Sequence, residues 1–76
     1  QRKKLSYNEQ REFERLPARI EEMEAEQDNL RGALAHPEFY KEPAEAINQV
    51  FSRLEQIHGE LLDLYQTWDD LDSRSK

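Results

Sequence analysis

The sequence contains no cysteine, only two glycines and three prolines, and no long apolar run among its 76 residues. The absence of cysteine excludes disulfide bridges and thiolate metal sites. No run of about 18 apolar residues is present, so a membrane span is not predicted. No basic and then apolar leader opens the chain, which argues against a signal peptide. We therefore expect a small soluble domain that does not bind membranes and that, because it begins with QRKK and no methionine, is a fragment of a longer protein.

Charge is abundant and unevenly placed. Charged residues make up 37% of the chain and the net charge is −6. Residues 1–19 nevertheless carry six basic and three acidic residues, whereas the remainder carries five basic and fourteen acidic ones. A basic amino-terminal end is thus joined to an acidic body, which makes that end the part most able to attract an anionic partner.

The first helix has a clear start signal and an internal proline. Ser6 is followed three residues later by Glu9, which is the spacing of a capping box, so a helix is expected from about Tyr7. Pro17 lacks an N–H and disfavours helical geometry in Leu16, at a cost of about 3 kcal/mol within a helix. A short amino-terminal helix or a kink is therefore predicted at Leu16-Pro17.

Apolar residues recur at alternating steps of three and four on both sides of a central turn. The first series is Phe13, Leu16, Ile20, Met23, Gln27, Leu30 and Leu34, in which Gln27 is polar; the second is Ile47, Val50, Leu54, Ile57, Leu61, Leu64, Trp68 and Leu71. Such spacing is typical of a heptad seam. Folding the chain at Tyr40 pairs the two series in one antiparallel register, from Leu34 with Ile47 to Phe13 with Trp68.

The predicted fold is all-α, an antiparallel two-helix coiled-coil hairpin that forms a single domain over residues 1–76. We expect helices over about 7–35 and 43–72, joined by a turn over 36–42. Phe51, His58 and Tyr65 fall seven residues apart beside the second series. They are expected to widen its apolar stripe.

The turn carries two aromatic residues in the stretch "ALAHPEFYKEP". Phe39 and Tyr40 are expected to fold back over Leu34 and Ile47 and close the end of the seam. The alternative is that they contact a partner.

Catalytic and cofactor motifs are scarce. The two glycines are isolated, so no phosphate-binding loop is present. Glu55 and His58 have a spacing used in di-iron bundles, but the second such pair and the additional glutamates are missing. Serines lack a histidine and a third orienting group, and a rod offers its carboxylates no cleft that would shift their pKa values. The domain is therefore expected to be non-enzymatic, without catalytic residues, metal or cofactor of its own.

The basic end is the strongest candidate for a binding site. Arg11, Arg15 and Arg19 are spaced by four and form one stripe along a helix. The predicted nucleic-acid-binding residues are Arg2, Lys3, Lys4, Arg11, Arg15 and Arg19. Such a stripe is typical of proteins that bind phosphate backbones. The alternative is a solvated helix whose arginines pair with nearby glutamates.

Several of these stretches resemble the C-terminal coiled-coil domain of the ABC-F ATPases, in particular the Uup-type members. The matching stretches are Lys4-Leu5-Ser6, Leu16-Pro17, the heptads from Leu30 to Leu34, Pro37-Glu38-Phe39-Tyr40 and Tyr65-Gln66-Thr67-Trp68-Asp69. The chain departs from the pattern at His36, where aspartate is common, and at Asp69, where glutamate is common.

The resemblance implies that two ATP-binding cassettes precede this domain in a cytoplasmic protein without membrane spans. ATP and Mg²⁺ would bind to those cassettes, and hydrolysis would take place there. In this family the tail is a nucleic-acid-interaction arm: the Uup-type tail is a DNA-binding coiled coil, while members in general act on ribosomes, so the expected partner is DNA or ribosomal RNA. Since no motif that reads base edges in a groove is present, we expect binding without sequence specificity, by a monomer. The alternative is an interaction or structural arm that contacts its own cassettes or another protein.

Overall fold

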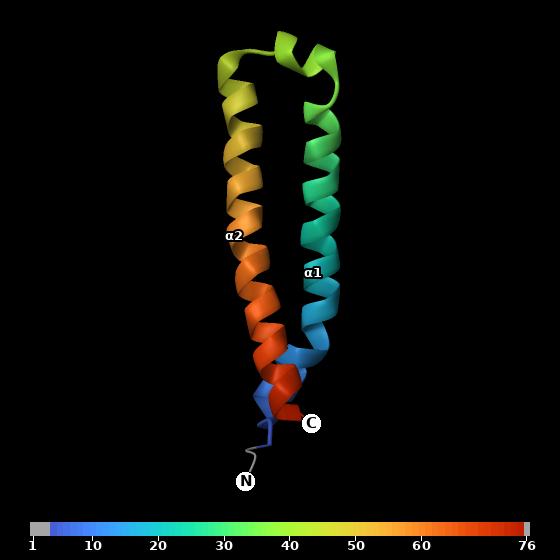
Figure 1. The fold of residues 1–76 in the computed structure, drawn as a ribbon, viewed down its shortest axis with the longest axis vertical. Coiled ribbons are helices and arrows are strands. Elements are labelled where there is room, and N and C mark those ends of the chain that lie inside the picture. The colour runs from blue at the N-terminus through green and yellow to red at the C-terminus, as the bar shows by residue number, and fades with distance from the viewer. Residues whose placement is uncertain (1–3, 76) are drawn as a thin grey trace.

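The computed structural model describes residues 4–75 of the chain and shows two long helices joined by a short one (Figure 1). Helix α1 spans Tyr7–Leu34, the 3-10 helix η1 spans Pro37–Lys41, and helix α2 spans Ala44–Ser75. The molecule is a rod of 58 × 16 × 15 Å. We call the end that carries η1 the tip, and the end where α1 begins and α2 finishes the base. The predicted all-α antiparallel hairpin is confirmed.

The core of the rod lies between α1 and α2 in the predicted register. Met23, Ile57 and Leu61 are buried together, and Ile57 has no exposed surface. Three partly buried residues from both helices pack against this cluster: Ile20, Leu30 and Leu64. Since Met23 and Ile57 are partners in the register read from the heptads, the apolar spacing is sufficient to align the two helices.

Helix α1 begins at a capping box, as the sequence predicts. The Glu9 N–H donates to the Ser6 hydroxyl at 3.2 Å, and the Ser6 N–H donates to the Glu9 carboxylate at 3.0 Å. These two bonds satisfy donors that would otherwise lack a partner at the start of the helix.

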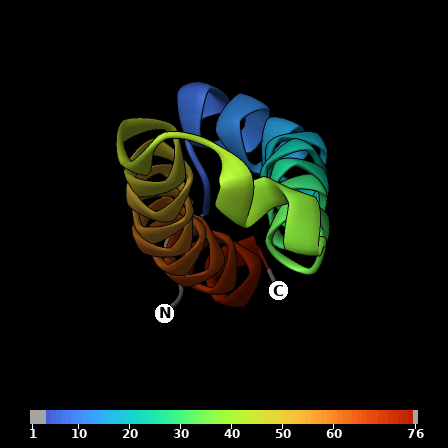
Figure 2. The same ribbon diagram turned by 90° about the horizontal axis from the view of Figure 1, so that it is seen from above.

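The path of α1 changes direction near Pro17, which confirms the predicted kink. Pro17 has no N–H to donate to the Phe13 carbonyl, and its ring crowds that carbonyl. Figure 1 shows the first turns of α1 passing across α2 at the base, and the view along the rod shows them running crosswise (Figure 2). The bend places the Phe13 ring 5.8 Å from that of Trp68.

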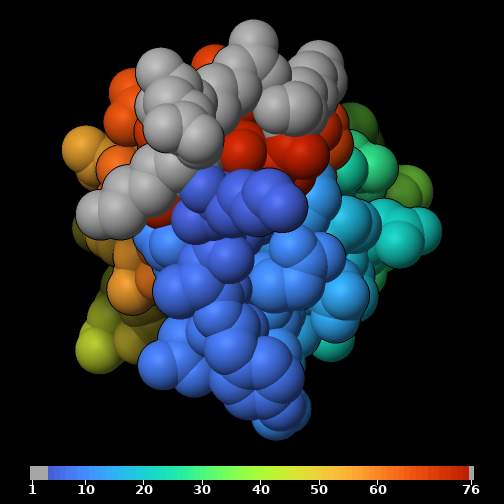
Figure 3. Space-filling model, turned by 90° about the horizontal axis from the view of Figure 1, so that it is seen from below, coloured from blue at the N-terminus to red at the C-terminus, as the bar shows by residue number. Residues whose placement is uncertain are grey.

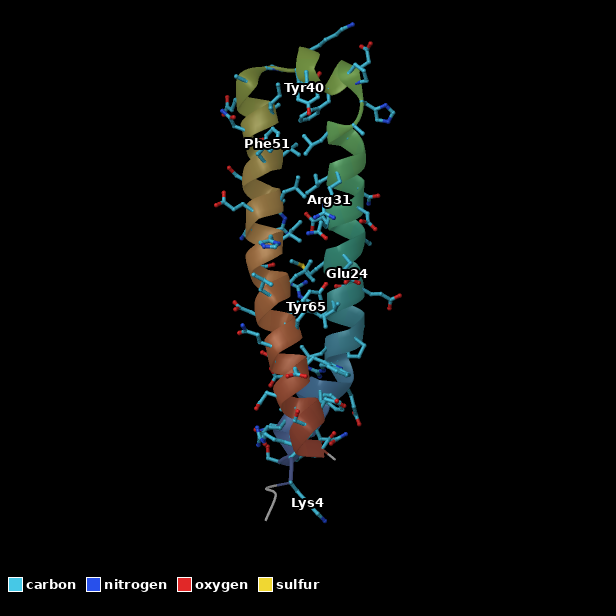
Figure 4. The ribbon with its side chains drawn as sticks, viewed as in Figure 1. Lys4, Glu24, Arg31, Tyr40, Phe51 and Tyr65 are labelled. Carbon is cyan, nitrogen blue, oxygen red and sulfur yellow. The ribbon has the colours of Figure 1, made fainter. Side chains whose placement is uncertain are left out.

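The tip is closed by η1. His36 precedes Pro37 at the first position of this helix, and the Tyr40 hydroxyl donates to the Leu34 carbonyl at 2.9 Å. Because the last carbonyls of an α-helix have no partner within it, this bond satisfies one of them. Figure 4 shows Tyr40 at the end of the rod, over the space between the two helices.

One expectation about α2 is wrong. Phe51, His58 and Tyr65 do not widen the buried stripe; all three are exposed, Phe51 by 48% and Tyr65 by 42%. A two-helix rod covers only one face of each helix, so positions beside the seam remain in solvent.

Neither α1 nor α2 contains a stretch apolar enough to cross a membrane. This finding concerns residues 4–75 only.

Candidate nucleic-acid interface

The first turns of α1 form a separate face at the base of the rod. The Pro17 bend turns these residues out of line with the rest of α1, and Figure 3 shows them at the centre of the surface seen from below, next to the last turns of α2. This face carries Tyr7, Arg11 and Arg15, all of them exposed.

Arg11 makes its contacts with an aromatic residue. Its Nη1 donates to the Tyr7 hydroxyl at 3.3 Å, and its guanidinium carbon lies 5.8 Å from the centroid of the Tyr7 ring. No salt bridge neutralises Arg11 among the described residues. Its positive charge therefore remains available to an anionic ligand.

Arg15 and Arg19 continue the stripe towards the bend. Arg15 has neither a salt bridge nor a side-chain hydrogen bond within residues 4–75. Arg19 lies 3.8 Å from Glu22, and both side chains are mostly exposed, at 54% and 72%. Because solvent screens such a pair, it holds Arg19 only weakly. The alternative of a stripe fully paired with glutamates does not hold for Arg11 and Arg15.

Two other arginines behave differently and serve the fold. Arg53 on α2 donates to both carboxylate oxygens of Glu26 on α1, at 2.7 and 2.8 Å. Arg74 on α2 lies 2.8 Å from Glu9. Hydrogen bonding to these glutamates raises the pKa of Arg53 and of Arg74. Arg53 and Arg74 thus form a set that is paired between the two helices, whereas Arg11, Arg15 and Arg19 at the base form a set that is unpaired between the helices within residues 4–75.

An open groove of about 600 Å³ runs along the unpaired set. Its lining residues are Asn8, Arg11, Glu12, Arg15, Leu16 and Arg19. Three guanidinium groups on one wall suit a ligand with several negative charges, since planar guanidinium groups match phosphate oxygens well. Glu12 is the single acidic residue in this lining and opposes such a ligand.

The structure brings three of the six predicted residues together, and these are Arg11, Arg15 and Arg19. Lys4 is exposed and projects beyond the base of the rod (Figure 4). Arg2 and Lys3 lie outside the described residues.

The sequence reasoning missed Tyr7 and Asn8 at this site. Tyr7 is 73% exposed, the largest exposed fraction among the large hydrophobic residues that the structure describes. The sequence could have placed Tyr7 on the arginine stripe, because it precedes Arg11 by four residues and residues four apart lie on the same face of a helix. Asn8 lines the groove itself.

Glu55 and His58, the pair with the spacing used in di-iron bundles, are both exposed. Within residues 4–75 no group of three or more potential metal ligands comes together.

The chain matches a known family model along nearly its whole length. The match, over residues 4–73, is to the ABC transporter C-terminal domain. The chain belongs to this family. Membership of the ABC transporter C-terminal domain family agrees with the resemblance seen in the sequence.

The curated relatives that the chain matches are described as ATP-binding proteins. The chain is 32% identical over 71 residues to the ATP-binding protein Uup of Haemophilus influenzae, and 33% identical over 70 residues to the ATP-binding protein Uup of Escherichia coli K12. These alignments cover 93% and 92% of the chain but 11% of each relative. A Uup-like ATP-binding protein of H. influenzae is also 32% identical, with 16% of its length covered. The chain therefore spans only a small part of these relatives.

A solved structure has the same fold. It is described by the statement "The C-terminal domain of the Uup protein is a DNA-binding coiled coil motif". The TM-score is 0.85 and the identity 31%, over 93% of this chain and 84% of the other.

Proposed function

We propose that this hairpin is a non-catalytic DNA-binding arm of a longer ATP-binding protein, and that it holds the phosphate backbone at the base of the rod. The observation that carries the proposal is that Arg11 and Arg15 have no salt-bridge partner within residues 4–75, while Arg53 and Arg74 are paired at 2.7–2.8 Å. The description of the Uup C-terminal domain as DNA-binding supports it.

The contacts that this face offers are to phosphate. Guanidinium groups along one helical stripe recognise the charge and spacing of the phosphates and do not distinguish one base from another. The acidic body of the rod repels phosphate and restricts binding to the base. We therefore expect binding without sequence preference by a monomeric hairpin, and ribosomal RNA, which has the same backbone charge, stays a second candidate ligand.

The rest of the protein is proposed from the relatives. Since the matched relatives are ATP-binding proteins and the chain covers 11–16% of their length, we place ATP, Mg²⁺ and hydrolysis in cassettes outside this chain. The site residues of the arm would then be Arg2, Lys3, Lys4, Arg11, Arg15 and Arg19, in a cytoplasmic protein.

The test is DNA binding by the 76-residue chain at two salt concentrations, for the wild type and for Arg11/Arg15/Arg19→Ala. The slope of log affinity against log salt is negative, and loss of three phosphate contacts should make it shallower by about two to three units. Duplex RNA of the same length serves as a further ligand. If the wild type binds no nucleic acid at low salt, the proposal is wrong; unchanged binding by the triple variant would refute the residue assignment.

Arg31 provides a charge-matched control. It is exposed, lies on α1 beyond the bend and outside the groove, and makes no salt bridge within the described residues. Arg31→Ala removes the same charge as Arg15→Ala. If DNA binds at the basic face, Arg15→Ala should therefore reduce DNA affinity more than Arg31→Ala does. Equal effects would indicate a response to net charge alone.

A second candidate function is a protein-interaction or structural arm. The exposed aromatic and aliphatic residues of α2 and the tip favour it: Tyr40 at 53%, Phe51 at 48%, Leu62 at 49% and Tyr65 at 42%. In this case the partner would be the protein's own cassettes or another protein. Absence of nucleic-acid binding, together with loss of a protein contact in Phe51→Ala and Leu62→Ala, would favour this function.

A further inference from the structure

Tyr7 is an exposed aromatic ring placed directly beside the unpaired arginines. It is 73% exposed, and its one side-chain hydrogen bond within residues 4–75 is the 3.3 Å bond that its hydroxyl accepts from Arg11. Burying a tyrosine ring is favourable, and this ring is left largely in solvent, with the Arg11 guanidinium over it at 5.8 Å. Its exposed surface is therefore free to contact a ligand that the arginines hold.

The charges around Tyr7 restrict what that ligand can be. The guanidinium group of Arg11 lies 5.8 Å from the ring centroid, and Arg15 follows one turn later with no salt bridge to any residue that the structure describes. A ligand that reaches Tyr7 while it neutralises these arginines needs a flat apolar group within about one helical turn of a negative charge. A nucleotide has both, as a base and a phosphate.

We propose that Tyr7 is a stacking platform for an unpaired base, so that the basic face prefers single-stranded over duplex DNA. This inference rests on the proposed function and names the form of DNA that the site selects. A paired base presents only its edge in a groove, because its faces are stacked on its neighbours, so Tyr7 has no ring face to contact on a duplex. On a single strand the arginines hold the backbone while a base covers the Tyr7 ring.

The bend at Pro17 makes this contact accessible. In a straight α1 the first turns would continue along the rod, whereas here they run crosswise at the base (Figure 2). The face with Tyr7 and Arg11 thus projects from the rod, and a strand can follow the groove with its bases turned towards Tyr7.

The experiment compares single-stranded oligothymidine, the same strand with abasic sites, and a duplex of equal length, each at low salt. Stacking of one base on an aromatic ring is worth about a tenfold change in affinity. Tyr7→Ala should therefore weaken single-strand binding by about tenfold and change duplex binding by less than about twofold. Removal of the bases should weaken the wild type but have little further effect on Tyr7→Ala.

Two variants separate ring stacking from other roles. Tyr7→Phe keeps the ring and loses the bond to Arg11, so it should retain the single-strand preference. Phe51→Ala removes a 48% exposed ring on α2 near the tip (Figure 4) and should change neither affinity. Circular dichroism confirms that each variant is folded.

The outcomes distinguish this inference from the proposed function. Equal wild-type affinity for the three ligands, or an equal loss for single strand and duplex in Tyr7→Ala, overturns the stacking role and leaves DNA binding intact. The same holds if Tyr7→Phe loses the preference as fully as Tyr7→Ala does. Absence of binding to all three ligands overturns both.

Discussion

The guanidinium group of Arg74 lies 2.8 Å from the carboxylate of Glu9 and joins the last turn of α2 to the first turn of α1. Glu9 also accepts the Ser6 N–H at 3.0 Å within the capping box. One carboxylate thus both caps a helix and connects the two helices at the base. Its protonation state should matter for stability.

Acid should destabilise the hairpin. The backbone bond from Ser6 and the bond from Arg74 lower the pKa of Glu9, and the bond from Arg53 lowers the pKa of Glu26. A carboxyl whose native pKa is lowered contributes stability that is complete above the unfolded-state pKa, about 4.3, and is lost as the pH falls through the lower native pKa. Melting temperatures should therefore fall below about pH 5.

The matched variants for this pH dependence are Glu26→Gln and Glu55→Gln. Glu26→Gln should show a shallower loss of melting temperature in acid, because its native carboxylate pair with Arg53 is gone. Glu55 is exposed and forms no ion pair within residues 4–75, so Glu55→Gln should follow the wild-type curve. An unchanged slope in Glu26→Gln would contradict the role given to the pair.

Ile57→Ala should destabilise the rod more than any exposed substitution. Ile57 has no exposed surface and sits in the Met23 cluster, and loss of a buried isoleucine side chain costs about 2–5 kcal/mol. For a small two-helix domain such a loss is a large part of the total stability. Leu62→Ala, at a position 49% exposed, should change the free energy of unfolding by less than about 0.5 kcal/mol. Urea titration measures both, and comparable losses would contradict the assigned core.

Phe39→Ala distinguishes closure of the tip from contact with a partner. Phe39 is partly buried and lines a groove with Leu30 and Val50, so we expect a lower melting temperature. Tyr40→Phe, which removes only the bond to the Leu34 carbonyl, should cost about 0.5–1.5 kcal/mol or less. Unchanged stability of Phe39→Ala with loss of binding would favour the partner contact.

Pro17→Ala should straighten α1. Alanine supplies the missing N–H for the Phe13 carbonyl and removes the ring that crowds it, so helix content should rise slightly. The Phe13 ring, now 5.8 Å from Trp68, should move away. Trp68 is the only tryptophan of the chain, so its fluorescence reports this change directly; an unchanged spectrum would mean that packing at the base, and not Pro17, sets the bend.

The register and the kink could be predicted because each depends on a local or periodic property of the sequence. Met23 meets Ile57, and Phe13 meets Trp68, because the apolar spacing fixes which faces can be buried together. The kink follows from the local chemistry of Pro17, which has no N–H to donate and whose ring crowds the Phe13 carbonyl.

Other features depend on distances that the sequence does not contain. The sequence predicts that Phe51 and Tyr65 are covered, but a single partner helix leaves both rings exposed, and α1 meets Tyr65 at its hydroxyl, which donates to Glu24 at 2.5 Å (Figure 4). The split between paired and unpaired arginines was also not predictable. Arg53 and Arg15 are the same residue type near many glutamates, and only the geometry between helices shows which of them has found a carboxylate.

Helix α1 begins and α2 finishes at the same end of the 58 Å rod (Figure 1). Any neighbouring domain would therefore be attached at the base, and the tip would be the free end of the hairpin. A small rotation about that attachment moves Tyr40 through a wide arc and moves Arg11 very little. A nucleic acid bound at the base would then move little relative to the neighbouring domain, whereas the tip of the hairpin would move over a long distance.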